Sequence, residues 1–367
     1  MPVTPYRAGV RAMIVKELRE LARDRRTLAM LIAMPLLLLV VFGYAASFYV
    51  SHVDAAVVGP QADEVADRLP AFFHVTVAEP GDTRADTEVL LRDDEVDVAI
   101  VTGGTRPTVL VDGSDLFAAQ AIVSGVNRLG DAVETEVLYN PDLKTSWVMV
   151  PAIVGLILTF IGVIITSIGM VRERESGTLE QLAVMPIRPS TVILGKIAPY
   201  FLIASVDMLI VTLLGMLLFD VPMNGNALAF ALGAAVFLFV VLGLGVFIST
   251  VSQTTGQAIQ TAFFLLLPQV LLSGMIFPLD AMAAGVRWIG YLLPLTYFNI
   301  IARGIMLRGA PIGSLWQAYV ILAVMAVVVF TGATLRYRRD LAPAGRAEGG
   351  GGTPEPATTA ATAAGNP

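Results

Sequence analysis

The stretch that decides the fold is Val171–Lys196, which reads VRERESGTLEQLAVMPIRPSTVILGK. It is polar and charged, and it separates two long apolar segments, Ser146–Val171 and Thr191–Phe219. A bilayer core of about 30 Å requires ~20 apolar residues in a helix. We therefore predict that this stretch connects two membrane spans at one surface of a bilayer.

The composition agrees with an integral membrane protein. Of the 367 residues, 56% are hydrophobic and 15% are charged, whereas an ordinary globular domain is about 25% charged. The chain has no cysteine, which excludes a disulfide framework and a thiolate metal site. We predict an α-helical polytopic membrane protein with six transmembrane helices. The predicted spans are Thr27–Val50, Ser146–Val171, Thr191–Phe219, Ala227–Val251, Gln257–Phe277 and Leu315–Leu335.

Basic residues near both ends of the chain predict its orientation. Seven arginines and lysines precede the first span, and Arg336, Arg338 and Arg339 follow the last. Under the positive-inside rule, we expect both termini in the cytoplasm. A cleavable signal peptide is the alternative for the first span, because Ala45 and Ala46 resemble a cleavage site. Its apolar run is longer than the ~7–15 residues of a signal core.

A polar insertion, Ser51–Thr145, separates the first two spans and is long enough to fold by itself. Its apolar spacing predicts a helix over Phe117–Val137. Short apolar runs bounded by turn residues predict four strands. These are Ala55–Val58, His74–Ala78, Val96–Val101 and Thr108–Val111. We expect a small extracytoplasmic α/β domain, and His52 and His74 lack the partners of a metal site.

Two terminal segments complete the predicted organisation. Residues 1–26 place Val10, Ile14 and Leu18 on one helical face with basic residues elsewhere, which is typical of a cytoplasmic amphipathic interface helix. A basic cluster that only sets topology is the alternative. Residues 343–367 are rich in Ala, Gly, Thr and Pro, so a disordered cytoplasmic tail is expected. The net charge of −6 gives no basic footprint for nucleic acid.

The connecting segment, residues 172–190, carries its own helix signals. Thr178 and Gln181 fit a capping box, and Pro186 would end the short helix that follows. Leu179, Leu182 and Ala183 would give this helix a small apolar face. Such a helix at the cytoplasmic surface could dock into the groove of a partner. A loop that only anchors two spans is the alternative, and spacing alone does not separate the two.

Three blocks of the sequence resemble the ABC-2 transporter permease family. VRERESGTLEQL, followed by a proline and LGK, resembles the segment that supplies this family's coupling helix. The opening block KELRELARDRRTLAMLIAMPLLLLVVFGYA resembles its interface helix and first span. The block LSGMIFPLDAM…GYLLPLTYFNIIARGIMLRGA, within Leu272–Ala310, resembles its external re-entrant hairpin, here residues 278–312. The inserted domain matches the subgroup with a large extracytoplasmic domain.

The resemblance implies where a partner ATPase would bind. The residues implied at that interface are Arg172, Glu173, Arg174, Glu175, Gly177, Thr178, Leu179, Glu180 and Leu182, with Arg11, Glu17 and Arg23 on the interface helix. Pro278, Pro294 and Tyr297 would shape the external hairpin. The chain has no GxxxxGK[ST] phosphate loop. We therefore expect no catalytic residue and no cofactor in this chain, with ATP and Mg bound by the partner.

The expected function is that of the permease subunit of an ATP-binding-cassette exporter in a bacterial cytoplasmic membrane. The resemblance implies a second permease subunit, as a homodimer or heterodimer, contact with membrane lipid, and an amphiphilic substrate such as a drug, lipid or secondary metabolite. A membrane receptor or scaffold that presents residues 51–145 is the alternative. An intramembrane enzyme is a weaker alternative, because the spans hold no His/Glu pair or Ser–His arrangement.

Several polar residues lie within predicted spans. Asp207 lies near mid-membrane, where a carboxyl group either lines a pathway for substrate or protons or braces helix packing. Gln257 and Gln260 share one face of the fifth predicted span, and they either line a pathway or bond between subunits. Gly155, Gly162 and Gly169 recur every seven residues on the second span, which predicts close helix packing.

Overall fold

The computed structural model describes Val50, residues 52–177 and residues 189–340, with six further positions among the first 49 residues. Four predicted features lie mostly or wholly outside these residues. They are the interface helix, the first span, the coupling helix after Gly177 and the tail from Pro343.

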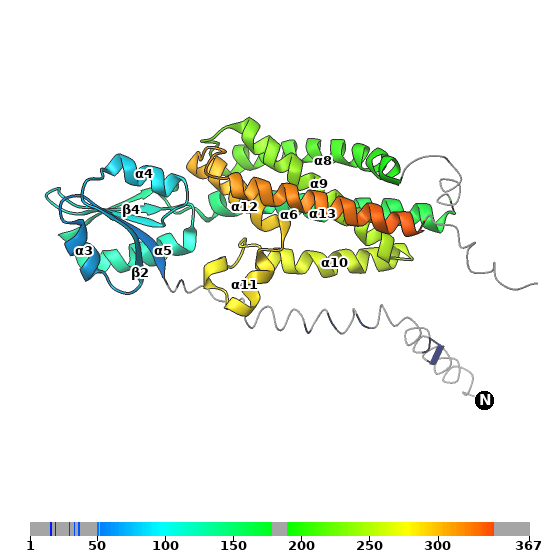
Figure 1. The fold of residues 1–367 in the computed structure, drawn as a ribbon, viewed down its shortest axis with the longest axis horizontal. Helices are drawn as coiled ribbons and strands as arrows, with labels where there is room; N and C mark the ends of the chain where they lie inside the picture. The colour runs from blue at the N-terminus through cyan, green and yellow to red at the C-terminus, as the bar shows by residue number, and fades with distance from the viewer. Residues whose placement is uncertain are drawn as a thin grey trace, which may run out of the picture.

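The described chain forms an α/β domain at one end of a long helical bundle (Figure 1). The domain contains the four predicted strands. Its elements are β1 (Val53–Val58), α3 (Ala62–Arg68), β2 (Phe73–Glu79), α4 (Arg84–Arg92), β3 (Val98–Val101), β4 (Thr108–Asp112), α5 (Leu116–Val126), η1 (Asn127–Ala132) and β5 (Glu134–Leu138).

The five strands form one sheet in the order β2-β1-β3-β4-β5. The pairs β1–β2, β1–β3 and β4–β5 are parallel, and β3–β4 is antiparallel, with Ile100 opposite Val109. Alternate side chains of a strand point to opposite faces, and both faces here are apolar. Helices α3 and α5 cover one face, and α4 covers the other. The sheet is therefore a buried layer between helices.

The predicted helix over Phe117–Val137 is wrong beyond Val126. Helix α5 ends there, η1 continues to Ala132, and Glu134–Leu138 forms strand β5. The apolar residues Val133 and Val137 fit a helical period as well as a strand. Pairing with β4 decides for the strand, because Val137 lies opposite Val111 in the register. The local spacing of apolar residues could not predict this pairing with a distant strand.

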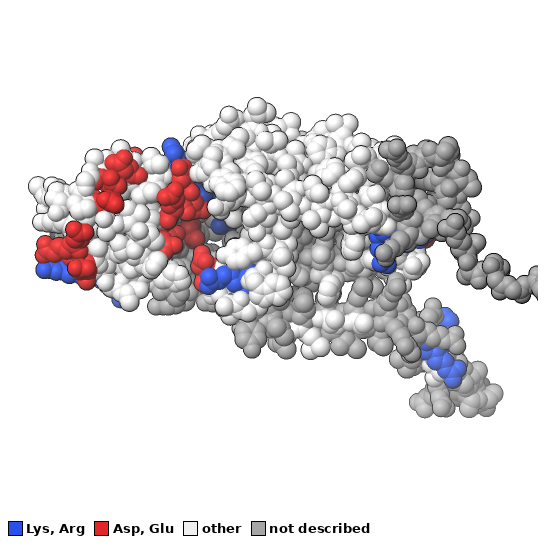
Figure 2. Space-filling model, in the orientation of Figure 1, with Lys and Arg blue, Asp and Glu red and all other residues white. Residues whose placement is uncertain are grey.

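The bundle contains five helices, among the described residues, that are long and apolar enough to cross a membrane. They are α6 (Thr145–Glu175), α8 (Pro189–Phe219), α9 (Ala227–Val251), α10 (Thr255–Leu272) and α13 (Trp316–Asp340). Helix α9 coincides with the predicted segment. Helix α6 continues past the predicted Val171, so the charged residues Arg172–Glu175 are helical. Among the described residues on the face in Figure 2, no Lys, Arg, Asp or Glu is visible in the middle of the bundle.

The fifth predicted span, Gln257–Phe277, differs from the observed helix at its second end. Helix α10 ends at Leu272, and Gly274 adopts a positive φ of 76°, which glycine tolerates because it has no Cβ. Short elements then follow: η2 (Leu279–Ala281), α11 (Ala284–Gly290), α12 (Pro294–Arg303) and the π-helical η3 (Gly304–Arg308). The chain bends by 78° between α11 and the continuous helix Pro294–Arg308.

Helix α6 lies at the centre of the bundle and packs against α8, α9, α10 and α12. The glycines of α6 permit this close packing, as their seven-residue spacing predicted. A Cβ at Gly155 would overlap Phe298 of α12, and one at Gly162 would lie 2.7 Å from a methyl group of Val241 on α9. Phe298 and Phe237 stack in the same core, with centroids 4.5 Å apart. Small residues therefore let three helix backbones approach closely.

Candidate functional site

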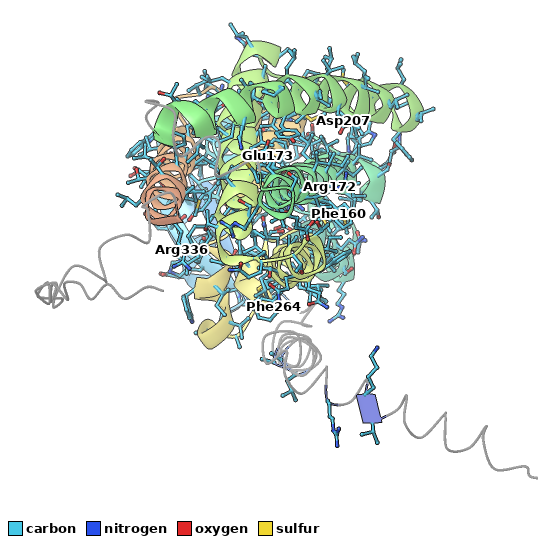
Figure 3. All side chains as sticks on the ribbon, turned by 90° about the vertical axis from the view of Figure 1, so that its right-hand side faces the viewer. Phe160, Arg172, Glu173, Asp207, Phe264 and Arg336 are labelled. Atoms are coloured by element: carbon cyan, nitrogen blue, oxygen red, sulfur yellow. The ribbon has the colours of Figure 1, made fainter. Side chains whose placement is uncertain are left out.

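The candidate site is the end of α6 that lies farthest from the α/β domain, Arg172–Glu175, called here the charged end of α6. Figure 3 looks onto this end of the bundle, with Arg172 and Glu173 labelled on α6 and Arg336 on α13. Sequence reasoning assigned Glu173, Arg174 and Glu175 to an interface with another protein. In the structure each of them also bonds a different helix of the same chain.

Glu175 binds the beginning of α10. Its carboxylate accepts hydrogen bonds from the Thr255 backbone N–H and the Thr255 Oγ1 hydroxyl, both at 2.9 Å. The first backbone N–H groups of a helix have no partner within the helix, and its dipole favours an anion there. Glu175 therefore caps α10 from a position 80 residues earlier in the chain.

Arg174 binds the end of α9. Its Nη1 donates to the carbonyl oxygens of Ser252 at 2.8 Å and Ser249 at 3.2 Å. The last carbonyl groups of a helix lack intrahelical partners, and a cation near them is favourable. Residues Ser252–Thr254 connect α9 to α10. The cationic Arg174 thus binds the carbonyl end of α9, and the anionic Glu175 binds the N–H end of α10, so each charge suits the dipole of the helix end that it contacts.

Glu173 binds the third helix. Its carboxylate forms an ion pair with the Lys196 ammonium of α8, and the Lys196 side chain is only 17% exposed. This ion pair gives Lys196 a defined partner on α6. Arg172 precedes these three residues and is exposed. The charged end of α6 therefore joins α8, α9 and α10 at one place.

The remaining predicted interface residues are only partly described. Gly177 follows the helix with a φ of 74°, in the left-handed region that favours glycine, so α6 ends there. The other predicted residues lie outside the described residues: Thr178, Leu179, Glu180, Leu182, Arg11, Glu17 and Arg23. Within the described residues, no group of three His, Asp or Glu side chains could hold a metal ion.

Comparison with known proteins decides the family. The model of the family described as "ABC-2 family transporter protein" matches residues 25–335. The chain belongs to this family. The Escherichia coli (strain K12) protein named "Probable multidrug ABC transporter permease YbhS" is 29% identical over 378 residues, which cover 93% of this chain and 99% of that protein. YbhR of the same organism, named in the same way, is 28% identical over 90% of this chain and 98% of its own length.

A shorter match agrees with this assignment. The Escherichia coli protein "Inner membrane transport permease YhhJ" is 33% identical over 214 residues, or 57% of this chain and 56% of that protein. The chain is therefore a transporter permease with several membrane helices.

The predicted pathway residues of the permease lie on two helices, Asp207 on α8 and both Gln257 and Gln260 on α10. Asp207 lies on α8, and its Oδ2 is buried without a hydrogen-bond partner among the described residues. Gln257 lies in the first turn of α10, where its Oε1 accepts from the Gln253 backbone N–H at 3.0 Å. Gln260 is exposed. The structure thus gives Gln257 a local role at a helix end, and it leaves Asp207 half-buried with one carboxylate oxygen that has no partner among the described residues.

The predicted hairpin residues lie at the end of the bundle that adjoins the α/β domain. Pro278 precedes η2, and Pro294 occupies the first turn of α12, where its missing N–H costs no hydrogen bond. The Tyr297 hydroxyl donates to the Tyr291 carbonyl at 2.7 Å and so holds α12 against the end of α11. Pro294 and Tyr297 therefore lie at the bend between α11 and α12, whereas Pro278 lies before both helices.

Sequence reasoning missed a buried ion cluster at this same end. Arg308 of η3 is 5% exposed and forms an ion pair with Asp94 and another, at 3.4 Å, with Asp112, which is 3% exposed. The Ser114 hydroxyl lies 3.4 Å from the same Nη1. Burial raises the pKa of Asp112 to about 6, although the nearby Arg308 opposes the rise. The cluster joins the α/β domain to the bundle.

Proposed function

We propose that this permease is the transmembrane subunit of an ATP-driven exporter, and that the charged end of α6 receives movement from a separate ATPase subunit. The single observation that carries the proposal is the set of bonds from Glu173, Arg174 and Glu175 to three different helices. A displacement of residues 172–190 would pull on all three helices together.

The length and packing of α6 support transmission across the bundle. Its 31 residues correspond to about 46 Å of helix. One end bonds α8, α9 and α10, while Gly155, farther along, lies against Phe298 of α12. Packed interiors deform little, so connected helices tend to move as near-rigid bodies. Movement at the charged end would therefore reach the bend at the α/β domain.

The remaining parts of the proposal follow from family membership and the positive-inside rule. Two permease subunits would assemble with two ATP-binding-cassette subunits, which bind the ATP and Mg. Both termini and the charged end of α6 would face the cytoplasm of a bacterial cell, and the α/β domain would face outward. ATP would bind one state of the complex more tightly than the other, and this difference in affinity would shift the permease between the two states.

An amphiphilic drug, lipid or secondary metabolite is the proposed substrate class. The names of YbhS and YbhR support it, because both call those relatives multidrug permeases. The bundle supplies apolar surface, with Asp207 as a half-buried polar group on α8. Membership in a transporter family does not support the alternative of a receptor or scaffold.

Separating ATPase binding from transport tests the proposal. Glu175→Ala removes the cap on α10, and Arg174→Ala removes the bonds to α9. Each variant should retain the ATPase during purification and show a several-fold lower export rate in proteoliposomes. Arg336→Ala is the matched control, because Arg336 is exposed at the same end and has no described bond to a neighbouring helix. Wild-type export by both variants would overturn the proposal.

A further inference from the structure

An apolar cavity of about 750 Å³ opens within the α/β domain, away from the charged end of α6 and the Arg308 cluster. Its floor is the sheet face that carries Ile100 and Val109. One wall is α5, and the other is formed by α3 and the first residues of β2. Ligand sites are usually concave, mostly apolar spaces of ~300–1,000 Å³ with a few polar groups at defined places. This cavity has those properties.

The walls of the cavity are built mostly from apolar side chains. Val65 and Leu69 of α3 stand on one side, next to Phe72 and Phe73, whose rings meet edge to face at 5.2 Å. On the other side lie Ala121, Ile122, Gly125 and Val126 of α5. Gly125 has no atom within 4 Å of the position that a Cβ would occupy. The chain thus leaves free space in the wall where a larger residue would fill it.

The polar groups at the cavity are few, and two of them are cationic. Among the described residues that line the cavity, only Arg68, Ser124 and Arg128 have polar side chains. Arg68 already forms an ion pair with Glu64 at 2.8 Å. Arg128 is exposed and has no ion pair within the described residues. An arginine without an ion-pair partner among the described residues, beside an apolar space, matches a ligand that carries a negative group on an apolar body.

The position of the cavity relative to the predicted membrane surface favours a lipid-like ligand. Val50 lines the cavity and is the last residue of the first predicted span. The cavity therefore adjoins the place where the chain is expected to leave the bilayer. An amphiphile could reach it from the neighbouring leaflet or from solution.

We infer that this cavity binds a long-chain carboxylate or a similar singly anionic amphiphile. The hydrocarbon chain of the ligand would lie between α5 and Phe72–Phe73, and its anionic group would lie at Arg128. Binding here does not require that the ligand be the exported substrate. The site would therefore exist whether or not the proposed export function is correct.

Photolabelling tests the inference in the full chain. The probe is a long-chain fatty acid that carries a diazirine, and the permease is held in phosphatidylcholine nanodiscs. The probe is supplied in one arm within the bilayer and in the other on albumin in solution, and labelled peptides are mapped by mass spectrometry. Label is expected on residues 65–73 and 121–128. The arm with the faster labelling identifies the source.

Two variants show whether the label reports the cavity. Gly125→Trp fills the space and should lower labelling of these residues by at least about tenfold. Gly81→Trp is the control, because a Cβ at Gly81 also meets no atom within 4 Å and Gly81 does not line the cavity. Arg128→Gln should weaken competition by the unlabelled carboxylate about fivefold, as expected for an exposed ion pair, and leave competition by the corresponding alcohol unchanged.

Three results would overturn the inference. One is the absence of label from residues 65–73 and 121–128 in both arms. Another is equal labelling of the Gly125→Trp and Gly81→Trp variants, which would indicate partition into the bilayer alone. The third is equal sensitivity of the carboxylate and the alcohol to Arg128→Gln. A change of oligomeric state in Gly125→Trp without any label in the wild type would assign the cavity to a protein partner instead.

Discussion

Replacing Arg308 with Gln should loosen the α/β domain from the bundle. In the wild type, the buried Arg308 guanidinium bonds Asp94 and Asp112 across this junction. Glutamine is shorter and neutral, so Asp112 would remain buried without a cation. Removal of one partner of a buried ion pair costs about 3–5 kcal/mol. We therefore expect the opening equilibrium of the junction to rise by about two to three and a half orders of magnitude, since ~1.4 kcal/mol is a factor of ten.

The effect of Arg308→Gln should depend on pH. The pKa of Asp112 is about 6 in the folded protein, above its ordinary value of 3.8, and Arg308 holds it lower than burial alone would. Without Arg308 the folded pKa rises further. A raised folded pKa means that the folded state takes up a proton more readily than the unfolded state. The variant should therefore be least stable near pH 8 and recover as pH falls through the folded pKa.

Hydrogen–deuterium exchange of the permease in nanodiscs measures this opening. The reporting amides are those of β4 and of Gly304–Arg308, and Arg106→Gln, at an exposed turn of the same domain, is the control. Asp112→Asn combined with Arg308→Gln should restore most of the protection, because the buried charge is then absent. A change of less than about tenfold at pH 8, or no recovery at pH 5.5, would refute the reasoning.

Three further predictions concern other buried groups. Burial raises the pKa of Asp97 to about 7 from an ordinary value of 3.8, so the ionised folded form is disfavoured, and the stability of the domain should fall as pH rises from about 4 to 7. Asp97→Asn keeps an acceptor for the Asp54 backbone N–H and should flatten this pH dependence in thermal unfolding; an unchanged profile would contradict the prediction. Asp207→Asn should lower the export rate in proteoliposomes if the half-buried carboxyl group acts in the pathway, and wild-type export would leave it a packing role. Gly155→Val should force α12 away from α6, because added atoms would overlap Phe298; we expect a loss of about 1–3 kcal/mol, and Gly332→Val, where a Cβ meets no atom within 4 Å, should unfold like the wild type.

The sequence predicted the parts of this protein that depend on local composition. Apolar length alone located α9 at Ala227–Val251, and alternating apolar runs located β1 to β4. The glycine spacing on α6 predicted close packing without naming Phe298 as the neighbour. These features follow from the hydropathy and the spacing of apolar residues, both of which can be read from a short segment of the sequence.

The sequence could not predict features that depend on distant partners. Arg308 bonds Asp112, 196 residues earlier, and neither residue has a local signal. Glu175 looked free to contact another protein, yet Thr255 lies 80 residues away in the chain and directly beside it in the fold. The apolar period of Glu134–Leu138 predicts helix, but pairing with β4 selects the extended form of strand β5.

The most direct test of the central claim is site-specific photocrosslinking from the charged end of α6 in intact cells. A photoreactive residue in place of Arg172, which is exposed beside Glu173, should form a covalent adduct with an ATP-binding-cassette subunit. The same residue in place of the exposed Thr105 of the α/β domain should not. Capture of the ATPase from Thr105, or from neither position, would contradict the account.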